Sequence, residues 1–359
     1  MNFKRLALTA LFVLLGYSAH AFHNTREAIE AVVGIHAEIP DDAFTSRTLG
    51  TVREGSGVAI DDKGHIVTIG YLVLEADLIE VTWPDGRTVG ASFVGYDSES
   101  GLGLIKADLP LGTKPIELGR SSDLEDGEPL IVAGRGASAQ AVLVVSRQEF
   151  AGTWEYMLAE AIFAAPSYAE YGGAALINHD GKLVGVGSLV TQVFMPSVGA
   201  LSVNMFVPID LLVPVLDDLI GTGRTRAASR PWLGVNVTET QGRVFVTGVT
   251  ASGPAANAGL GQGDVILTVD GKAVEGLSDL YRKVWALGEA GVRVRMSVLQ
   301  GTQIRRITID SSDRFRFLKS PPRRKRGTLA LSPFDADRPA TLRHFAAQMR
   351  SASSFKGYM

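Results

Sequence analysis

The chain contains no cysteine among its 359 residues. This absence excludes disulfide bonds and thiolate metal sites, so the folded protein depends on hydrophobic cores for its stability. The sequence also lacks a G-x-S-x-G nucleophile elbow, an H-E-x-x-H zinc motif and a phosphate-binding P-loop. We therefore expect no cofactor and no metal ion.

A long hydrophobic run is missing as well. The chain begins with Lys4 and Arg5, continues with an apolar run over residues 6–16, and then reaches Ala19-His20-Ala21. The run is well short of the roughly 20 residues that a membrane-spanning helix needs. Basic residues, a short apolar run and an A-x-A site predict a secretory signal over residues 1–21, cleaved after Ala21, and hence a periplasmic protein. A lone membrane anchor is the alternative.

Charge is unevenly distributed along the chain, although the net charge is only -3. Residues 314–359 contain eleven Lys or Arg and two Asp, so the C-terminal part is basic and the rest is acidic. We predict a basic, disordered tail over residues 313–359. In an exported protein its expected partner is an anionic membrane surface or the acidic body of the same protein, and not a nucleic acid.

From Ala28 to about Pro110, the sequence shows short apolar runs separated by turn residues. Asp61-Asp62-Lys63-Gly64 lies between two such runs, and Pro84-Asp85-Gly86 lies between two more. Both turns are rich in residues that tolerate the backbone geometry of a hairpin. This part of the sequence is therefore predicted to be antiparallel β-structure. Farther along, Asp210 after Pro208 predicts the N-cap of a helix that reaches Ile220.

The same stretch resembles trypsin-like proteases of the HtrA/Deg class. Gly55-Ser56-Gly57-Val58 matches the family's G-S-G-V strand, and residues 101–106 match its D-L-A-V-L-K strand. The resemblance implies a chymotrypsin-type double β-barrel over residues 22–222. It also places Tyr71 where the family has its general-base histidine and Gly101 where it has the orienting aspartate.

A second stretch, residues 164–186, resembles the family segment that carries the nucleophilic serine. Counted forward from Ala164-Ala165, the serine position falls on Tyr171; counted backward from Leu176-Ile177-Asn178, it falls on Gly172. Neither residue is an ordinary acylating nucleophile. Glu170 lies where the family's loop turns backbone amides toward the oxyanion, and a carboxylate there would oppose the developing negative charge. Triad catalysis is therefore not expected.

Substitute catalytic groups are the alternative hypothesis, which would make the chain an active serine endopeptidase with a rearranged site. Ser56 and Ser167 are the serines nearest to the matched motifs. His65 and His179 both lie beside turns, and we expect them to be exposed polar residues.

The last folded region resembles a bacterial PDZ domain. Residues 223–230 are polar and predict a linker, and residues 252–272 match S-x-A-x-x-A-G-L-x-x-G-D-V-I-x-x-V-x-G at nearly every position. The resemblance implies a PDZ domain over residues 231–312, in which the backbone amides of Leu233, Gly234 and Val235 receive the C-terminal carboxylate of an extended peptide. Leu280 and Val284 would line its side-chain pocket, although their helical spacing is equally that of ordinary core.

The sequence thus predicts a mostly β protein, with a chymotrypsin-type double β-barrel followed by an α+β PDZ domain. The expected function is binding of peptides or unfolded polypeptide C-termini, as a scaffold, regulator or holdase in protein quality control of the cell envelope. The sequence leaves formation of a homo-oligomer open.

Overall fold

The computed structural model describes residues 25–109, 112–195 and 199–319. The predicted signal sequence and the predicted tail beyond residue 319 lie outside the described residues. Within these ranges, no helix combines the length and apolar character that a membrane crossing requires.

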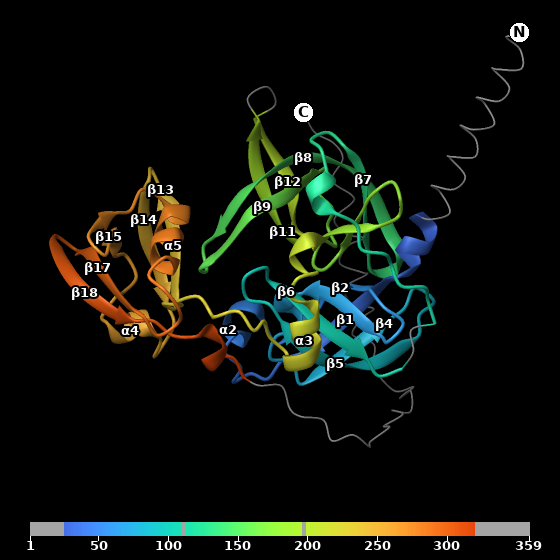
Figure 1. The fold of residues 1–359 in the computed structure, drawn as a ribbon, viewed down its shortest axis with the longest axis horizontal. Helices are drawn as coiled ribbons and strands as arrows, with labels where there is room; N and C mark the ends of the chain where they lie inside the picture. The colour runs from blue at the N-terminus through green and yellow to red at the C-terminus, as the bar shows by residue number, and fades with distance from the viewer. Residues whose placement is uncertain (1–24, 110–111, 196–198, 320–359) are drawn as a thin grey trace, which may run out of the picture. The chain divides into compact units, whose positions relative to one another are not determined.

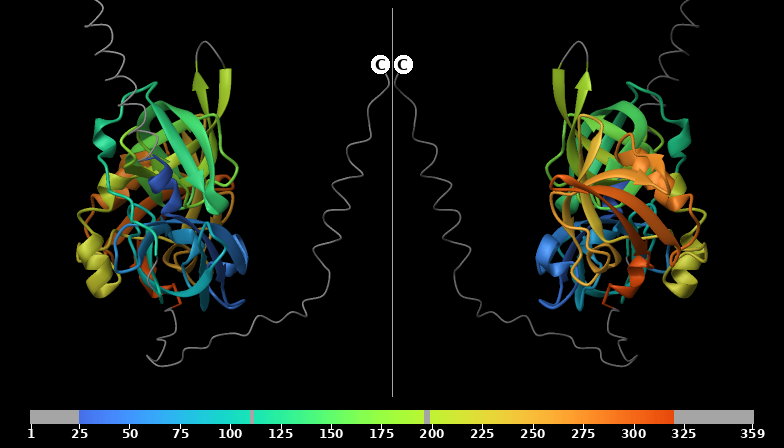
Figure 2. Two further views of the ribbon diagram at one scale, coloured as in Figure 1. Left: turned by 90° about the vertical axis from the view of Figure 1, so that its right-hand side faces the viewer. Right: turned by 90° about the vertical axis from the view of Figure 1, so that its left-hand side faces the viewer.

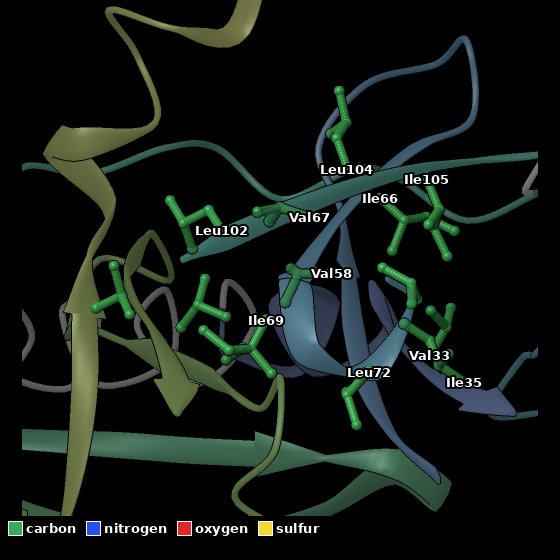
Figure 3. Close-up of a cluster of buried hydrophobic side chains, with 14 of the residues drawn as sticks. Val33, Ile35, Val58, Ile66, Val67, Ile69, Leu72, Leu102, Leu104 and Ile105 are labelled. Carbon is green, nitrogen blue, oxygen red and sulfur yellow. The ribbon is translucent and has the colours of Figure 1, made fainter. Parts of the chain in front are cut away.

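The first six strands close into a barrel in the order β1-β2-β3-β6-β5-β4. They are β1 (Val32–Glu38), β2 (Val52–Ala59), β3 (His65–Ile69), β4 (Leu78–Thr82), β5 (Thr88–Tyr96) and β6 (Leu102–Ala107). The two predicted turns connect β2 to β3 and β4 to β5, and both pairs are antiparallel. Valine, isoleucine and leucine side chains fill the interior (Figure 3), because alternate residues of each strand point inward.

The next six strands close into a second barrel in the order β10-β11-β12-β9-β8-β7. They are β7 (Pro129–Gly134), β8 (Ser138–Gly152), β9 (Tyr156–Ala165), β10 (Ala175–Ile177), β11 (Leu183–Met195) and β12 (Gly199–Pro208). The blue and cyan strands of the first barrel and the green strands of the second are separate groups in every view (Figures 1 and 2).

The two barrels approach each other backbone to backbone at the Gly-Gly pair of residues 172–173. The amide of Ser56 in β2 donates a hydrogen bond to the carbonyl oxygen of Gly172 at 2.8 Å. A Cβ atom on Gly173 would lie 1.9 Å from the carbonyl oxygen of Ser56. Gly173 also has a φ of +74°, in the left-handed region that favours glycine. The pair is therefore needed for the contact between the barrels.

A separate sheet follows in the order β13-β14-β15-β17-β18, with β16 paired to β15. The strands are β13 (Val235–Thr240), β14 (Arg243–Val249), β15 (Val265–Val269), β16 (Lys272–Ala273), β17 (Arg293–Gln300) and β18 (Gln303–Asp310). Helices α4 (Pro254–Asn257) and α5 (Leu277–Trp285) accompany this sheet, which has its own core. The predicted fold class, a double β-barrel followed by an α+β domain, is confirmed.

The helix predicted from Asp210 to Ile220 begins later than predicted, at Leu216. A 3-10 turn, η4 (Ile209–Leu211), is followed by a short helix α3 (Leu216–Thr222). Pro214 explains the break, since it has no amide proton and disfavours helical geometry in the residue before it. Asp210 does not cap α3; its carboxylate accepts hydrogen bonds from the amides of Ser121 and Ser122, each at 2.9 Å.

The long hairpin that β8 and β9 form was not anticipated from the sequence. Figure 1 shows this green hairpin reaching the sheet edge at β13 and helix α5. Residues 313–319, assigned to the tail from sequence, include the 3-10 turn η5 (Arg314–Arg316). The ring of Phe317 lies 4.6 Å from that of Trp232, and the Lys319 amide donates to Glu75 at 2.7 Å.

We predict that Gly173→Ala lowers the free energy of unfolding by more than about 4 kcal/mol, because the methyl group would overlap the Ser56 carbonyl. Gly127→Ala is the matched control: Gly127 has a φ of +83°, but a Cβ there would meet nothing within 4 Å. The control should cost only the left-handed strain of about 1 to 2 kcal/mol. Urea unfolding followed by circular dichroism measures both, and equal losses would contradict the contact.

Candidate functional site

Tyr71 lies in the 3-10 turn η1 (Gly70–Leu72) that follows β3. Its phenol is partly buried against the barrel core and donates a hydrogen bond to the carbonyl oxygen of Ser188 in β11 at 2.8 Å. Burial, and to a smaller extent the neighbouring Tyr171, raises the pKa of Tyr71 above its ordinary value. The hydroxyl therefore stays protonated at neutral pH and cannot take a proton from a nucleophile.

Gly101 lies beside Tyr71, because its carbonyl oxygen accepts a hydrogen bond from the Gly70 amide at 2.8 Å. Its φ of +79° suits glycine and strains other residues. A Cβ atom at this position would meet the ring and hydroxyl of Tyr156 at 3.3 Å. That hydroxyl in turn donates to the Ser100 carbonyl at 2.6 Å. Tyr156 thus packs against the position from which an aspartate would orient a base.

The second barrel brings Gly172 to the same place. A Cβ atom on Gly172 would point to the hydroxyl oxygen of Tyr71, at 3.0 Å. A serine at residue 172 would therefore face residue 71, as a nucleophile faces its base. Tyr171 is close enough to affect the pKa of Tyr71. Of the two alignments left open by the sequence, this direction favours Gly172 as the counterpart of the serine.

The sequence led us to expect that Glu170 carries an uncompensated charge into the cleft. The structure differs, because this charge is paired. The Glu170 carboxylate accepts a hydrogen bond from Arg135 Nε at 2.7 Å, and Arg135 Nη1 also donates to Glu54 at 2.6 Å. All three side chains are substantially exposed. The Arg135–Glu54 pair therefore links the two barrels at the surface, and exposed pairs of this kind contribute little to stability.

The substitute catalytic groups have other contacts. Contrary to expectation, His65 is buried; its Nδ1 lies 2.6 Å from the carboxylate of Asp61 in the adjoining turn. His179 is exposed, as expected. The Ser56 hydroxyl is fully buried and accepts a hydrogen bond from the Arg135 amide at 3.0 Å. Ser167 accepts one from Ser202 at 3.3 Å.

Within residues 25–109, 112–195 and 199–319, no group of three His, Asp or Glu side chains is arranged to hold an ion.

The backbone amides of Leu233, Gly234 and Val235 converge at the start of β13. All three donate to one carboxylate, that of Glu155, at 2.7, 2.8 and 3.1 Å. Gly234 has a φ of +76°, which lets successive amides turn to the same side. The loop therefore has the geometry of a carboxylate receptor.

Leu280 and Val284 face the core of this domain from helix α5. They are only 1% and 2% exposed and share the core with Leu233 and Val235. Ala151 and Met157 of the β8–β9 hairpin pack against the same cluster. The residues predicted to line the side-chain pocket are thus part of the core of this domain, and the hairpin side chains pack against that core.

Glu155 is a site residue that the sequence prediction missed. Thr153-Trp154-Glu155 connects β8 to β9, and the third residue of a three-residue hairpin loop takes left-handed geometry. The bounds of this loop come from the structure, so the sequence offered no signal for Glu155. Glu155 has a φ of +57°, where glycine is usual. Burial raises the pKa of its carboxyl to about 7, although the three amides and Arg314 favour the charged form.

Comparison with known proteins matches both folded parts of the chain. The trypsin-like peptidase domain model matches residues 55–186, and the PDZ domain model matches residues 231–310. The serine protease Do-like HtrA of Lactobacillus helveticus is 27% identical over 67% of this chain and 65% of its own length. A probable periplasmic serine endoprotease DegP-like of Pseudomonas fulva is 31% identical over 68% of this chain and 53% of its own length.

Among solved structures, the HtrA-type protease AlgW with a decapeptide is 25% identical and has a TM-score of 0.50. The match covers 85% of this chain and 99% of that one. The chain spans less than two thirds of the length of the curated relatives it matches first. These similarities support the prediction of an HtrA/Deg-type trypsin-like peptidase homologue with a PDZ domain.

We predict that Tyr71→Ala lowers the free energy of unfolding of the chain by about 2 to 3 kcal/mol, because the ring packs between the barrels. Tyr71→Phe keeps the ring and loses only the hydrogen bond to Ser188, so it should cost about 1 kcal/mol. Urea melts monitored by tryptophan fluorescence distinguish the two. A Tyr71→Ala melt that superimposes on wild type would show that the ring does not stabilise the cleft.

Proposed function

We propose that this protein is a catalytically inactive homologue of HtrA/Deg-type serine proteases that binds polypeptide C-termini through its PDZ domain. The observation that carries the proposal is the carboxylate receptor formed by the amides of residues 233–235. Three convergent amides suit one carboxylate, and a peptide C-terminus supplies a carboxylate at the end of a strand.

The loss of catalysis is supported by the cleft between the barrels. Tyr71, Gly101 and Gly172 lie together where the resemblance places the triad, and none of them is a base, an orienting carboxylate or a nucleophile. Loss of one triad member already costs roughly three to four orders of magnitude in rate. The cleft is then a packed junction, in which a tyrosine hydroxyl binds backbone and not substrate.

Peptide binding is supported by the PDZ match and by the structure of AlgW, which was solved with a decapeptide. A periplasmic location is supported by the N-terminal signal pattern and by relatives that are described as periplasmic endoproteases. In that compartment, a binder of exposed C-termini would act as a scaffold, regulator or holdase for unfolded polypeptides.

We predict that the purified chain, residues 22–359, neither reacts with a fluorophosphonate probe nor cleaves denatured casein. An active HtrA-type protease serves as the positive control in the same gel. Labelling that disappears in Ser167→Ala or Ser56→Ala would contradict the proposal and establish a rearranged serine endopeptidase.

We predict modest affinity for peptides with a free carboxyl terminus and an apolar last residue, and loss of that affinity on C-terminal amidation. Amidation removes the negatively charged carboxylate to which the backbone amides of residues 233–235 would donate hydrogen bonds. Fluorescence anisotropy with labelled hexapeptides ending in Ala, Val, Leu or Phe measures both forms. Equal titration of acid and amide would show that this loop is not the receptor.

A further inference from the structure

The carboxylate receptor of the PDZ domain is already occupied by a segment of the same chain. Glu155 is 9% exposed, and its two carboxylate oxygens accept the amide protons of Leu233, Gly234 and Val235. When the Glu155 carboxylate is ionised, hydrogen bonds to it are about twice as strong as those to a neutral acceptor. Glu155 therefore makes the contacts that a peptide C-terminus would make.

The strand edge next to the receptor is also engaged. In the described sheet, β13 pairs with β14 on one side only. On its other side the Val237 amide donates to the carbonyl oxygen of Thr153 at 2.8 Å. An added peptide strand would need this same amide. The hairpin tip thus provides both the carboxylate and a backbone acceptor.

Helix α5 also contacts the hairpin tip and holds it in place. The Tyr281 hydroxyl donates to the Gly152 carbonyl at 2.7 Å and accepts from the Glu155 amide at 3.0 Å. Arg282 forms an ion pair with Glu149 of β8. These contacts hold both ends of the tip, so the position of Glu155 does not depend on one bond.

The backbone at Glu155 has a conformation that is unfavourable for a side chain. Residue 155 is the left-handed position of a three-residue hairpin loop, where glycine avoids the strain that a side chain adds. A glutamate that is strained, buried and desolvated is locally unfavourable. The amide contacts offset this cost, and a tip with glycine at residue 155 would form the same hairpin without them.

We propose that the tip of the β8–β9 hairpin, residues 152–155, is an internal ligand of the PDZ domain, and that external C-termini bind by displacing it. The proposal rests on the peptide-binding function proposed above and adds its regulation. The affinity of an external peptide is reduced by the fraction of molecules in which the receptor is free. The ligand class is an extended peptide whose terminal carboxylate replaces that of Glu155.

The test uses the chain of residues 22–359 with Glu155→Gly, which preserves the left-handed turn and removes the carboxylate. The hexapeptides with free carboxyl termini should bind this variant at least about tenfold more tightly than wild type. Glu160→Ala is the matched control, since Glu160 lies on the same hairpin, is exposed and pairs with Arg147 of the barrel. Its affinity should equal that of wild type.

Hydrogen exchange gives a readout without peptide. The amides of residues 233–235 and of Val237 should exchange faster in Glu155→Gly than in wild type. The Trp232 amide, which donates to the Ser312 carbonyl at 3.0 Å, should keep its rate and serves as an internal control. Two milder variants should raise the peptide affinity and the exchange rates by smaller factors. Tyr281→Phe loosens the tip but keeps Glu155, and Glu155→Gln is isosteric but uncharged. They replace Glu155→Gly if that variant does not fold.

Two failures are distinguishable. In the first, wild type and Glu155→Gly bind the free-acid peptides with equal affinity, and neither binds the amidated peptides. The receptor then binds C-termini without competition from Glu155, and the internal ligand is refuted. In the second, neither protein binds any acid peptide, and the proposed binding function is refuted together with the inference. Unchanged exchange at residues 233–235 would refute the internal ligand by itself.

Discussion

The close approach of two backbones at residues 172–173 is the constraint on which the double barrel depends. The Ser56 amide bonds to the Gly172 carbonyl, and Gly173 leaves no room for a Cβ atom. This contact sets the distance between the barrels and therefore the width of the cleft. It also positions Gly172 against the Tyr71 hydroxyl. Packing between the barrels therefore holds the residues that we propose to have replaced the triad.

A second constraint, the carboxylate of Glu155, joins the second barrel to the PDZ domain. Burying a carboxylate costs several kcal/mol unless hydrogen bonds compensate it, and here the PDZ loop provides three amides. The Glu155 carboxylate and the three loop amides therefore satisfy each other's hydrogen bonds. The hairpin needs the loop to stabilise its charge, and the loop needs an acceptor for its amides.

In our proposal, these two constraints together give the barrels a role other than catalysis. A barrel whose cleft is filled by a tyrosine is a rigid support, and a long hairpin extending from it can hold a side chain at a fixed place. In our proposal that side chain is the internal ligand of the PDZ domain. Retention of the fold would then follow from the need to position Glu155, and the packed cleft contributes the stiffness.

The sequence by itself determined the fold class and the short hairpins, because turn chemistry such as Asp61–Gly64 and the long PDZ motif act locally. It also predicted site positions at residues 71, 101 and 233–235, and these stay predictions. Tertiary structure decided the features that depend on strand length and on contacts between distant segments, namely the extent of β8 and β9 and the burial of His65. It also brings Gly172 against the Tyr71 hydroxyl, which favours Gly172 over Tyr171 as the counterpart of the serine. The meeting of Glu155 with Leu233 joins residues 78 positions apart. No local pattern encodes that contact, since it arises only when a hairpin of one domain reaches the loop of another.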